Sequence, residues 1–368
     1  MPNNTRKILS PILFPISLLY GIIVYIRNRF YDYKIFKSND FKIPLISVGN
    51  ITVGGTGKTP HIEYLVDFLK SEFKVATLSR GYKRKTKGFI LSTSESTDQQ
   101  IGDEPRQIKQ KFPEIEVAVD ANRTNGINQL TESKNDLDVI LLDDAYQHRK
   151  VNANLSILLI DYSRPIDKDY IMPFGDLREQ ASEKRRADII IITKSPKDLQ
   201  PIDRRLIYND LNTYPFQVVY FTCFEYGKLE FVFNASGNNS KNEDLNDYQV
   251  LLITGIANPK PLQEHILENI SKNIQEIEYS DHYDFKESDL KKIAYKFDLI
   301  ESEKKIIITT EKDAMRLQKF SNIANNLSDS FFYIPIKVKF LNDRSDNFNQ
   351  QIIEYVRKNQ KHSFLYPR

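Results

Sequence analysis

The residues best suited to chemistry lie in the stretch VGNITVGGTGKTP, from Val48 to Pro60. It follows a short apolar run, residues 43–48, and precedes a segment of helical periodicity. A loop in this place turns its backbone amides toward the positive end of the helix, so it binds anions such as phosphate. The Gly-Lys-Thr ending matches the Walker pattern, but the glycine expected five residues before Gly57 is Thr52.

We predict that eight consecutive residues bind the nucleotide: Thr52, Val53, Gly54, Gly55, Thr56, Gly57, Lys58 and Thr59. The glycines let the backbone approach the phosphates closely. Lys58 can reach the β and γ phosphates, and the hydroxyl of Thr59 can ligate Mg²⁺. An ordinary glycine-rich turn is the alternative, but a strand before the loop and a helix after it favour a phosphate site.

Two carboxylates close a second apolar run, in DVILLDD, where residues 139–142 lead into Asp143 and Asp144. Carboxylates at this place can hold Mg²⁺ directly or through water. A strand that ends in two aspartates is a weak signal alone. Together with the Gly-Lys-Thr loop, it predicts the acidic half of a nucleotide and Mg²⁺ site.

A parallel sheet with helices on both faces must position these residues, because short apolar runs alternate with helical segments after the amino terminus. The expected strands are residues 43–48, 75–79, 117–119, 139–142, 155–160 and 189–193. In the helical segment HIEYLVDFLKSEF, the periodicity puts Ile62, Leu65, Val66 and Leu69 on one face. The fold class is therefore α/β, with a P-loop type of parallel sheet.

The pattern changes near residue 216. FQVVYFTCFEYGKLEFVFN has two β-rich runs around Gly227, which predicts a hairpin, and a polar linker follows over residues 236–247. The alternation then resumes with QVLLITGI, KIIITTEKD and SFFYIPIKV as strands. We predict an N-terminal membrane-anchoring helix over 1–30, a nucleotide-binding domain over 31–215, a β-hairpin and linker over 216–247, and a second, smaller α/β domain over 248–368, with a cleft between the two domains.

Composition narrows the function classes. Lys plus Arg number 52 and Asp plus Glu 49, so the net charge of +3 gives no global footprint for a nucleic-acid partner. The single cysteine, Cys223, excludes an intrachain disulfide framework and a cysteine-clustered zinc site, which fits a reducing compartment. Nothing in the sequence points to an obligate protein partner.

An uncharged apolar segment, residues 8–26, approaches the roughly 20 residues that a membrane-spanning helix needs. Pro11 and Pro15 interrupt its first half, so we expect the helix to start near Pro15 and to lie in the membrane interface. A spanning helix and a buried core helix remain alternatives. The flanking bases, Arg6, Lys7, Arg27 and Arg29, would meet anionic headgroups.

The motifs, taken together and in order, resemble those of the tetraacyldisaccharide 4'-kinases of lipid A biosynthesis over nearly the whole chain. They are VGNITVGGTGKTP, SRGYKRK, GDEP, DDAYQH, GDLRE, TGIANPKP, SDHYDF and TTEKDA. The resemblance implies that the γ-phosphate of ATP passes to the 4'-hydroxyl of a lipid substrate, tetraacyldisaccharide 1-phosphate, to form lipid IVA. It also implies a location at the cytoplasmic face of the inner membrane of a Gram-negative bacterium. The family itself has threonine at the position of Thr52.

The resemblance assigns roles to four further residues. Asp103, in GDEP, would be the base that guides the acceptor's proton, paired with His282 of SDHYDF. Arg178, in GDLRE, would stabilise charge on the transferring phosphoryl group, and Glu104 would support Mg²⁺ or the acceptor. Without the resemblance, simpler explanations are available for three of them. Asp103 could cap a helix, and His282 could be a solvated loop histidine. Arg178 could form a surface ion pair with Glu179 or Asp176. Because Asp103 and His282 fall in different predicted domains, we expect domain closure to assemble the site.

Weaker candidates surround these residues. We expect Gln147 and His148 to support the acidic pair, and Asp281 to orient His282 or cap a helix. Tyr82, Lys83 and Arg84 could meet the substrate or its 1-phosphate, and so, less strongly, could Asn122 and Arg123; a solvated loop is the alternative. Three residues depart from the family pattern: Ala145, Tyr146 and Tyr283 stand where glycine, phenylalanine and a second histidine are usual.

The main rival is a membrane-associated P-loop GTPase or partitioning ATPase with no small-molecule acceptor. A guanine switch should carry Asn-Lys-x-Asp, and the nearest sequences, ITKSP at 192–196 and TEKD at 310–313, do not match. A purely structural membrane-tethered module is a third reading. It leaves Lys58, Asp103 and Asp143 without a purpose.

Overall fold

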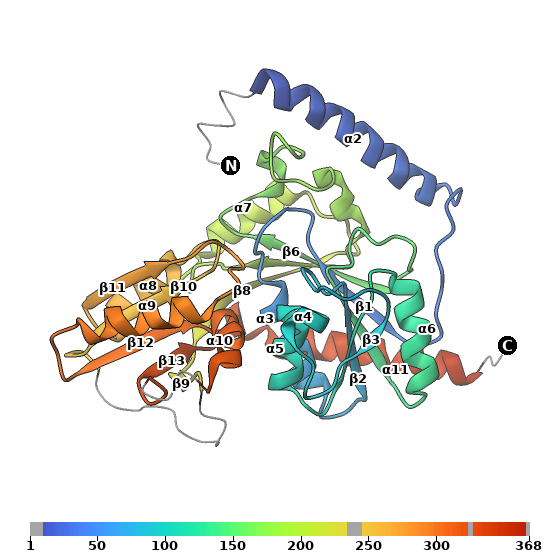
Figure 1. The fold of residues 1–368 in the computed structure, drawn as a ribbon. Coiled ribbons are helices and arrows are strands. Elements are labelled where there is room, and N and C mark those ends of the chain that lie inside the picture. The colour runs from blue at the N-terminus through green and yellow to red at the C-terminus, as the bar shows by residue number, and fades with distance from the viewer. Residues whose placement is uncertain (1–9, 234–244, 323–326, 366–368) are drawn as a thin grey trace. The chain divides into compact units, whose positions relative to one another are not determined.

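The computed structural model describes residues 10–233, 245–322 and 327–365, and its internal contacts divide the chain into two units (Figure 1). Unit 1 comprises the chain up to Phe224 and from Val338 onward, and unit 2 comprises Glu225–Lys337. Unit 2 is therefore an insertion into unit 1. The α/β class expected from the sequence is confirmed.

Unit 1 is built on a nine-stranded sheet in the order β14-β8-β7-β6-β1-β5-β2-β4-β3. Its centre is β1 (Leu45–Gly49), which pairs in parallel with β5 (Val139–Asp143) and β6 (Leu155–Asp161). The other strands are β2 (Val75–Ser79), β3 (Ile90–Leu91), β4 (Glu116–Val119), β7 (Ile189–Thr193), β8 (Val218–Tyr226) and β14 (Ile336–Phe340). Central strands buried on both faces read as continuous apolar runs, which is why the sequence identified them.

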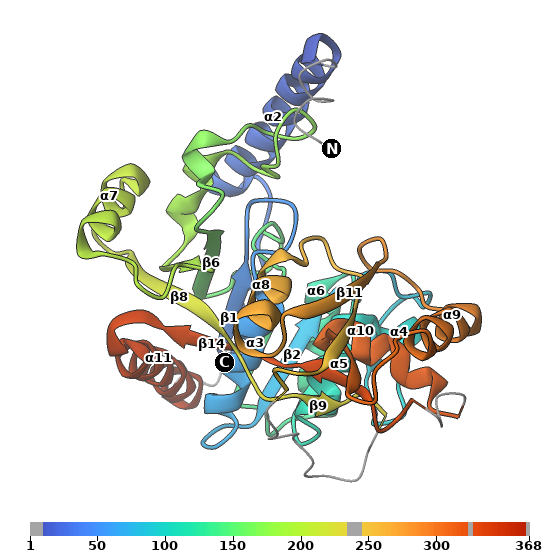
Figure 2. The same ribbon diagram turned by 90° about the vertical axis from the view of Figure 1, so that its left-hand side faces the viewer.

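Helices cover both faces of this sheet (Figure 2). On one face α3 (Lys58–Leu69), α5 (Asp103–Lys111) and α11 (Ser345–Leu365) pack on a shared apolar core. That core includes the predicted face of α3, namely Ile62, Leu65, Val66 and Leu69. On the other face lie α6 (Arg123–Ser133) and α7 (Pro201–Leu211). Short helices complete the unit: α4 (Asp98–Ile101), η1 (Ile166–Lys168), η2 (Ala181–Arg186) and η4 (Leu341–Asp343).

Unit 2 is a five-stranded sheet in the order β11-β10-β12-β13-β9. The strands are β9 (Glu230–Phe231), β10 (Gln249–Thr254), β11 (Asn273–Glu278), β12 (Lys305–Thr310) and β13 (Phe331–Ile334). One face packs on α8 (Lys260–Asn269), and the other on α9 (Glu287–Asp298) and α10 (Glu311–Leu317), which η3 (Gln318–Phe320) extends. Each unit therefore has apolar cores of its own.

The two β-rich runs around Gly227 do not form the expected hairpin. β8 pairs in parallel with β7, whereas β9 pairs antiparallel with β13 in the other sheet. Gly227 donates its backbone N–H to the carbonyl of Pro335 at 2.8 Å, so the turn contacts the residue just before β14. Two apolar runs beside a glycine show that strands exist, but they do not show which strands pair. Most of the predicted linker, residues 236–247, lies outside the described residues.

The carboxyl terminus also departs from the predicted boundaries, which assigned 248–368 to the second domain. β14 joins β8 at the edge of the larger sheet, and α11 contributes Phe348, Ile352 and Val356 to the core under α3. The observed division is therefore at 224/225 and 337/338. The sequence did not show this return because the run that ends in β14 continues directly from β13.

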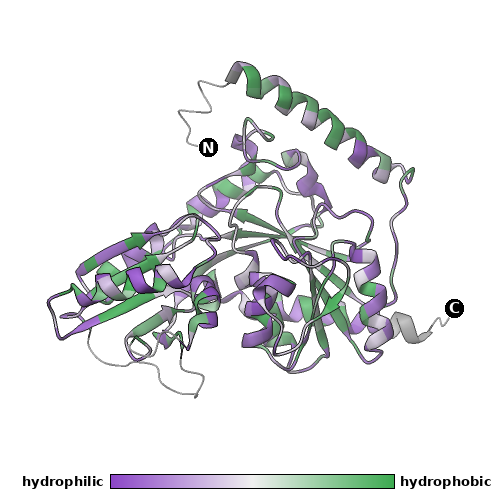
Figure 3. Cartoon of the chain, in the orientation of Figure 1, coloured by the Kyte–Doolittle hydropathy of each residue, from purple (hydrophilic) through white to green (hydrophobic). Residues whose placement is uncertain are grey.

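The amino-terminal apolar segment is one helix, α2 (Ser10–Asp32), so it starts earlier than the expected Pro15. Pro15 lies inside it, and the helix is long and apolar enough to cross a membrane (Figure 3). One narrow stripe of the helix, which includes Ser17, Val24 and Asn28, is buried against the rest of unit 1. Large apolar side chains project elsewhere: Ile12, Phe14, Ile16, Leu18, Leu19, Ile22, Ile23 and Ile26 are each at least 45% exposed.

Candidate functional site

The glycine-rich loop links β1 to α3 and begins at the buried Asn50. Asn50 donates from Nδ2 to the hydroxyl of Thr56 at 2.8 Å, which ties the two ends of the loop together. Gly57 has φ 85°, and a Cβ there would come within 2.6 Å of the Phe224 ring, so only glycine fits. A Cβ on Gly55 would meet no atom within 4 Å. Space for a ligand is therefore open beside the loop.

Thr52 lies in an isolated antiparallel bridge with Leu177, on the GDLRE segment. Val53 donates its backbone N–H to the carbonyl of Asp176 at 2.8 Å, and the amide of Arg178 donates back to the loop at 2.7 Å. Thr52 is buried and its backbone is not left-handed. This position needs a residue that pairs as a strand does, so the missing Walker glycine is not a defect.

Cationic side chains that the sequence did not single out surround the loop. Lys194, which follows β7, donates to the carbonyl of Gly55 at 2.5 Å and to Asp161 at 2.7 Å. Arg164 donates to the carbonyl of Val53 at 3.2 Å. They place positive charge beside the loop, which favours an anionic ligand. Lys194 lies in ITKSP, which we weighed only as a base-reading motif, and no local pattern marks Arg164.

Asp144 brings two predicted site residues together at the end of β5. Nη1 of Arg178 lies 3.1 Å from both carboxylate oxygens of Asp144. Nζ of Lys58 lies 3.5 Å from Oδ1 of the same residue. Asp144 has φ 48°, a left-handed conformation uncommon outside glycine. The arginine of GDLRE therefore pairs with the acidic strand end, a partner that the sequence did not indicate.

Asp143 is buried, and its Oδ1 has no hydrogen-bond partner among the described residues. Burial, together with the negative charges of Glu104 and Asp144, raises the pKa of Asp143 to about 7, although the positive charges of Lys58 and Arg123 act to lower it. The contribution of Glu104 indicates that the first turn of α5 lies close to the acidic pair. Burying a carboxylate is unfavourable unless a positive charge compensates it, and a bound cation would supply that charge. A residue that binds a metal ion is expected to have these properties.

The first turn of α5 carries Asp103 and Glu104, directly after Gly102. Gly102 has φ 93°, and a Cβ there would lie 3.0 Å from the carbonyl oxygen of Tyr82, so the loop after β2 packs tightly on the helix start. Acidic side chains in a first turn are stabilised by the helix dipole. The predicted base is therefore held on a rigid element.

The buried Glu63 of α3 fixes the flank of α5. Its Oε1 accepts from Nε2 of Gln107 at 2.6 Å, and its Oε2 pairs with Nζ of Lys111 at 2.7 Å. Gln107 and Lys111 follow Asp103 at intervals of four residues, so they share its side of the helix. The helix after the glycine-rich loop thus positions the helix that carries the predicted base.

The basic loop after β2 divides into two parts. Arg84 donates to the carbonyls of Gly88 at 2.6 Å and Val119 at 3.4 Å, so it braces its own loop in this structure. Tyr82 is 63% exposed, with Nζ of Lys83 5.9 Å from its ring centroid. These two remain candidates for contact with an acceptor.

Asn122 and Arg123, weak candidates for substrate contact in the sequence, make structural contacts within the chain. Asn122 caps α6 through a hydrogen bond from the amide of Asn125. The buried guanidinium of Arg123 donates to the backbone carbonyl of Asp120 at 2.6 Å and to that of Asp143 at 2.9 Å. Burial lowers the pKa of Arg123 to about 10, which leaves it charged at neutral pH. Arg123 therefore holds the end of β5 and its charge faces the acidic pair.

The buried Glu179 ties α2 to the rest of unit 1, which the sequence did not predict. Arg27 donates to its Oε1 at 2.8 Å, and Asn28 donates to the same oxygen at 3.3 Å. Arg186 pairs closely with Oε2. Glu179 directly follows Arg178, so the helix at the amino terminus contacts the segment that holds the site arginine.

In unit 2 a buried network positions His282. Nη2 of Arg316 lies 3.1 Å from Nδ1 of the imidazole, and Nη1 lies 2.9 Å from the fully buried carboxylate of Asp313. Asp313 accepts from the amide of Gly255 at 2.8 Å and from the hydroxyl of Thr310 at 2.7 Å. The motifs TGIANPKP, SDHYDF and TTEKDA therefore meet at one point.

Asp281 does not orient the imidazole by a hydrogen bond, because its Oδ1 lies 4.0 Å from Nε2 of His282. Tyr283, the departure from the family's second histidine, packs against Tyr279 and Phe285 with ring centroids 4.6 and 5.4 Å away. It thus belongs to the apolar packing of unit 2. Of the predicted site residues, Lys58, Glu104, Asp143, Asp144 and Arg178 converge in unit 1, Asp103 lies beside Glu104, and His282 lies in unit 2.

A family model described as Tetraacyldisaccharide-1-P 4'-kinase matches residues 9–357. The chain belongs to this 4'-kinase family. A tetraacyldisaccharide 4'-kinase of Phocaeicola vulgatus is 47% identical over 365 residues, covering 99% of both chains. One of Bacteroides fragilis is 48% identical and covers 100% of this chain and 98% of its own length. LpxK from Aquifex aeolicus, solved in complex with ATP, is 29% identical with a TM-score of 0.73, covering 96% of this chain and 99% of its own.

These similarities decide between the readings that the sequence left open. The chain has tetraacyldisaccharide 4'-kinase activity and uses ATP, so the GTPase, partitioning ATPase and structural readings are set aside. Lys194 of ITKSP contacts the glycine-rich loop in this 4'-kinase. TEKD supplies the buried Asp313 that holds Arg316.

The unusual DDAYQH sequence has a packing reason. A Cβ on Gly49 would lie 2.8 Å from Cβ of Tyr146, so the strand of the glycine-rich loop and this motif touch directly. The hydroxyl of Tyr146 donates to the carbonyl of Glu183 at 2.7 Å. Gln147 donates to the carbonyl of Asn50 at 2.7 Å, and so supports the start of the loop.

His148 and His61 are both neutral at physiological pH, for the same physical reason. Burial, followed by the charges of Arg123 and Arg80, lowers the pKa of His148 to about 4. Burial lowers the pKa of His61 to about 4 as well. His61 bridges the carbonyl of Gly57 at 2.7 Å and the hydroxyl of Thr222 on β8 at 3.1 Å. The position of His61, four residues after Gly57, did not indicate this bridging role in the sequence.

The oxygen donors at the end of β5 and in the first turn of α3 suit a hydrated metal ion such as Mg²⁺. In residues 10–233, 245–322 and 327–365, no three His, Cys, Asp or Glu side chains form a ready ligand cage. Mg²⁺ in nucleotide sites does not need one, because it keeps waters and shares the phosphates. The unpartnered Oδ1 of Asp143 and the buried hydroxyl of Thr59 in the first turn of α3 fit such an ion.

Proposed function

We propose that Asp103 accepts the proton of the 4'-hydroxyl of tetraacyldisaccharide 1-phosphate while Lys58 and Arg178 stabilise the phosphoryl group that leaves ATP. The observation that carries this proposal is the convergence of Lys58 and Arg178 on Asp144, beside the glycine-rich loop. Two fixed cations at the end of a strand next to such a loop suit the charge of a transferring phosphoryl group.

In the proposed reaction the 4'-oxygen forms a bond to the γ-phosphorus as the bond from that phosphorus to the β-bridging oxygen of ATP breaks. ADP leaves with the bond's electron pair, and the hydroxyl proton passes to the carboxylate of Asp103. Lys58 balances charge on the β and γ phosphates, and the planar guanidinium of Arg178 binds phosphate oxygens. Arg178 and Lys58 then exchange their present partner, Asp144, for the nucleotide.

His282 is the proposed second participant, and it acts from unit 2. Arginine only donates hydrogen bonds, so the contact from Arg316 requires Nδ1 to be an acceptor and puts the ring proton on Nε2. An imidazole in this tautomer donates from Nε2 and can hold the carboxylate of Asp103 or an acceptor oxygen in position. This role requires the two units to close on the substrates.

Mg²⁺ is the proposed metal, held by Asp143, Asp144 and the hydroxyl of Thr59, with Glu104 as a further oxygen donor. When bound, it would neutralise charge on the β and γ phosphates. The raised pKa of Asp143 supports the assignment, because a buried carboxylate with two acidic neighbours lacks the positive charge that a cation brings. The protein's own part is to place the buried carboxylate of Asp143 at the end of β5, beside the glycine-rich loop.

We further propose that α2 binds the cytoplasmic face of the inner membrane. Its exposed apolar side chains and the arginines at its end support an interfacial position, and its length also permits a span. An enzyme that takes a lipid acceptor needs access to the bilayer surface. The bond from α2 to Glu179 keeps the site segment close to the helix.

The test is to incubate the purified chain with ATP, Mg²⁺ and tetraacyldisaccharide 1-phosphate, and to follow the lipid by mass spectrometry. A product heavier by one phosphoryl group is expected, and it should vanish in Asp103→Ala. ATP hydrolysis that is independent of lipid, with no phosphorylated lipid, would contradict the proposed reaction.

A further inference from the structure

The backbone carbonyls of the glycine-rich loop are held one after another, from residue 53 to residue 57. Side chains hold four of the five, and three of those side chains come from the ends of β6 and β7 or from the residues just after them. The partners are Arg164 for Val53 at 3.2 Å, the amide of Thr56 for Gly54 at 3.1 Å, Lys194 for Gly55 at 2.5 Å, Thr193 for Thr56 at 2.9 Å, and His61 for Gly57 at 2.7 Å.

These contacts orient the peptide groups of the loop. In the sheet, β6 and β7 lie on one side of β1, and β5 lies on the other. A trans peptide points its C=O and its N–H in opposite directions, so carbonyls held toward β6 and β7 turn the amides that follow them toward the β5 side. Lys58 and Arg178 meet Asp144 on that side. The amides are thus directed toward the predicted phosphate site.

Asp161, the last residue of β6, anchors the two cations among these donors. It is 4% exposed, and its Oδ2 accepts from Nζ of Lys194 at 2.7 Å while Nη2 of Arg164 lies 3.6 Å away. Its Oδ1 accepts from the amide and the hydroxyl of Ser163 at 3.0 and 2.7 Å. Burial acts to raise the pKa of Asp161, but the hydrogen bonds from Lys194 and Ser163 outweigh it and hold the pKa below its usual value. The buried carboxylate is therefore charged at neutral pH.

Lys194 is held in an unusual backbone conformation directly after β7. Its φ is 55°, in the left-handed region that residues with a Cβ rarely adopt. The amide of the next residue, Ser195, donates to the carbonyl of Thr222 at 2.9 Å, which fixes the turn. A left-handed residue whose surroundings maintain its conformation is a candidate for a functional role. Here the turn aims the ammonium group at both Asp161 and the loop.

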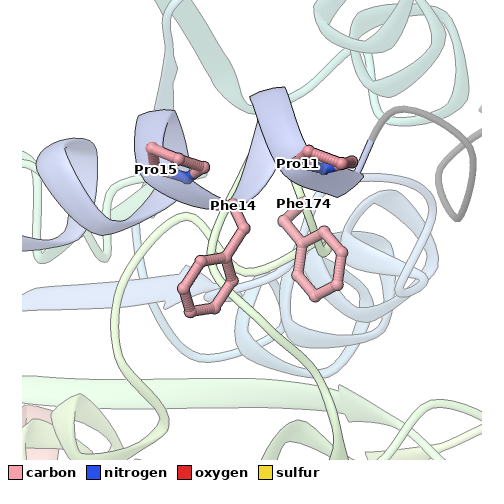
Figure 4. Close-up of a pocket in the computed structure, with 4 residues that line it drawn as sticks. All are labelled: Pro11, Phe14, Pro15 and Phe174. Atoms are coloured by element: carbon pink, nitrogen blue, oxygen red, sulfur yellow. The ribbon is translucent and has the colours of Figure 1, made fainter.

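The first part of the loop is held in a different way, by backbone pairing. Thr52 forms its bridge with Leu177, and the segment before Leu177 packs on α2, where the rings of Phe14 and Phe174 meet with centroids 5.8 Å apart (Figure 4). Residues 54–57 include three glycines, whose backbone adopts many conformations at little cost. This second part therefore depends more on the side chains that hold its carbonyls.

We propose that Asp161, Lys194 and Arg164 form a carbonyl brace that positions the loop for ATP. Lys194 acts through the carbonyl of Gly55 and not by contact with the nucleotide. Without the brace the peptide after Gly55 is free to turn over, and its carbonyl oxygen would then face the phosphates and repel them. The inference rests on the assignment of the loop as the phosphate site, and it is independent of the proposed base, metal and membrane contact.

Asp161→Asn is the decisive variant, because a brace and a direct charge contact predict opposite effects. Removing a negative charge beside the loop should strengthen the binding of an anion, and it would release Lys194 toward the phosphates. The brace predicts weaker binding instead, since both cations lose their anchor. We expect the Kd for ATP with Mg²⁺, measured by calorimetry without lipid, to rise roughly 5- to 50-fold in Asp161→Asn and also in Lys194→Met.

A double variant and a matched lysine complete the design. Asp161→Asn and Lys194→Met act on the same contact, so the double variant should bind ATP within about twofold of the weaker single variant. Lys168→Met is the control: Nζ of Lys168 lies 3.9 Å from Asp210, its side chain is 69% exposed, and its loss should leave the Kd unchanged. KM for the lipid substrate should stay within about twofold in all four variants, and thermal midpoints without ligand show that each is folded.

Three results would overturn the brace: unchanged or tighter ATP binding by Asp161→Asn, additive losses in the double variant, or an equal loss in Lys168→Met. Lys58→Ala separates this failure from a failure of the proposed function. If Lys58→Ala bound ATP normally, the loop would not be the phosphate site, and the proposed role of Lys58 would fall together with the brace. If Lys58→Ala lost affinity while Asp161→Asn did not, the brace alone would be wrong.

Discussion

Arg316 donates a hydrogen bond of 3.1 Å from Nη2 to Nδ1 of His282, and this contact selects one tautomer of the imidazole. Arg316 is itself held by the buried Asp313, so the donor cannot easily turn away. The histidine backbone is left-handed at φ 57°, and its amide donates to the carbonyl of Gly255 at 3.1 Å. Ring and backbone are thus both fixed before any substrate binds.

The fixed tautomer predicts that two amide replacements of His282 behave differently. The side-chain amide of glutamine reaches the position of Nε2–H and keeps a donor there, whereas that of asparagine reaches only the position of Nδ1. We expect His282→Gln to retain at least about tenfold more turnover than His282→Asn, with similar KM for ATP. Steady-state kinetics and the thermal midpoint of each variant check this. Equal losses in both variants would refute a donor role for Nε2.

Substitutions of the proposed base, Asp103, and of the proposed phosphate ligand, Lys58, should have different kinetic effects. Asp103→Ala should lower kcat on the order of 10²- to 10⁴-fold and leave ATP affinity almost unchanged, because general-base catalysis acts only in the transition state. Lys58→Ala should weaken ATP binding and turnover together. ATP affinity from calorimetry and turnover from the lipid assay decide the matter. Near-normal turnover in Asp103→Ala would show that the base is another group.

The buried Asp143 predicts that the metal-free enzyme loses stability as pH rises. Its folded pKa of about 7 lies above the unfolded value of 3.8, so the folded state binds the proton more tightly. The resulting penalty is absent below about pH 4, grows between pH 4 and 7, and is complete above pH 7. Asp143→Asn should therefore stabilise the metal-free protein at pH 8 by roughly 1–3 kcal/mol while it abolishes activity.

Denaturant unfolding at pH 8 and at pH 5 measures this difference, with EDTA or with Mg²⁺ present. The gain should shrink at pH 5, and Mg²⁺ should stabilise the unmodified protein more than the variant. A gain of the same size at both pH values would mean that Asp143 does not titrate in this range.

Glu63 predicts a coupling between stability and turnover. Glu63→Ala would leave the buried amide of Gln107 and the amine of Lys111 without this partner, at a cost of roughly 1–3 kcal/mol. The same change should lower kcat several-fold more than it alters KM for ATP, because α5 carries Asp103. Lys70→Ala is the control: its ion pair to Glu114, 2.9 Å long, is largely solvated and should contribute at most about 1 kcal/mol. Unchanged kcat in a folded Glu63→Ala would contradict the positioning role.

Much of the fold followed from the sequence because the central strands of unit 1 are buried on both faces. β2 and β7 begin and end at the predicted residues, Val75–Ser79 and Ile189–Thr193. Pairing between distant runs could not be predicted in the same way. The local pattern around Gly227 is the same whether the second run returns to β8 or crosses to β13, and only long-range packing decides.

The candidate site likewise has a part that the sequence predicted and a part that it did not. The glycine-rich loop and the pair Asp143 and Asp144 were predictable, since a short motif contains most of the chemistry. The partners that hold them come from distant strands: Lys194 reaches Gly55, and Arg178 reaches Asp144. Such contacts depend on where strand ends meet, and a linear pattern does not encode this. Arg316 lies two residues after the motif TTEKDA, but nothing in the sequence around it indicated a histidine as its partner.

The insertion of unit 2 into unit 1 has a consequence for biosynthesis. Translation delivers residues 225–337 as one uninterrupted segment, complete before Val338–Phe340 of β14 and the whole of α11 have left the ribosome. Most of unit 1 is synthesised first, but its core beneath α3 is incomplete until Phe348 and Ile352 have been synthesised. A chain that ends prematurely before Val338 would carry a finished inserted unit beside an unfinished nucleotide-binding sheet, with its edge strand β8 open to aggregation.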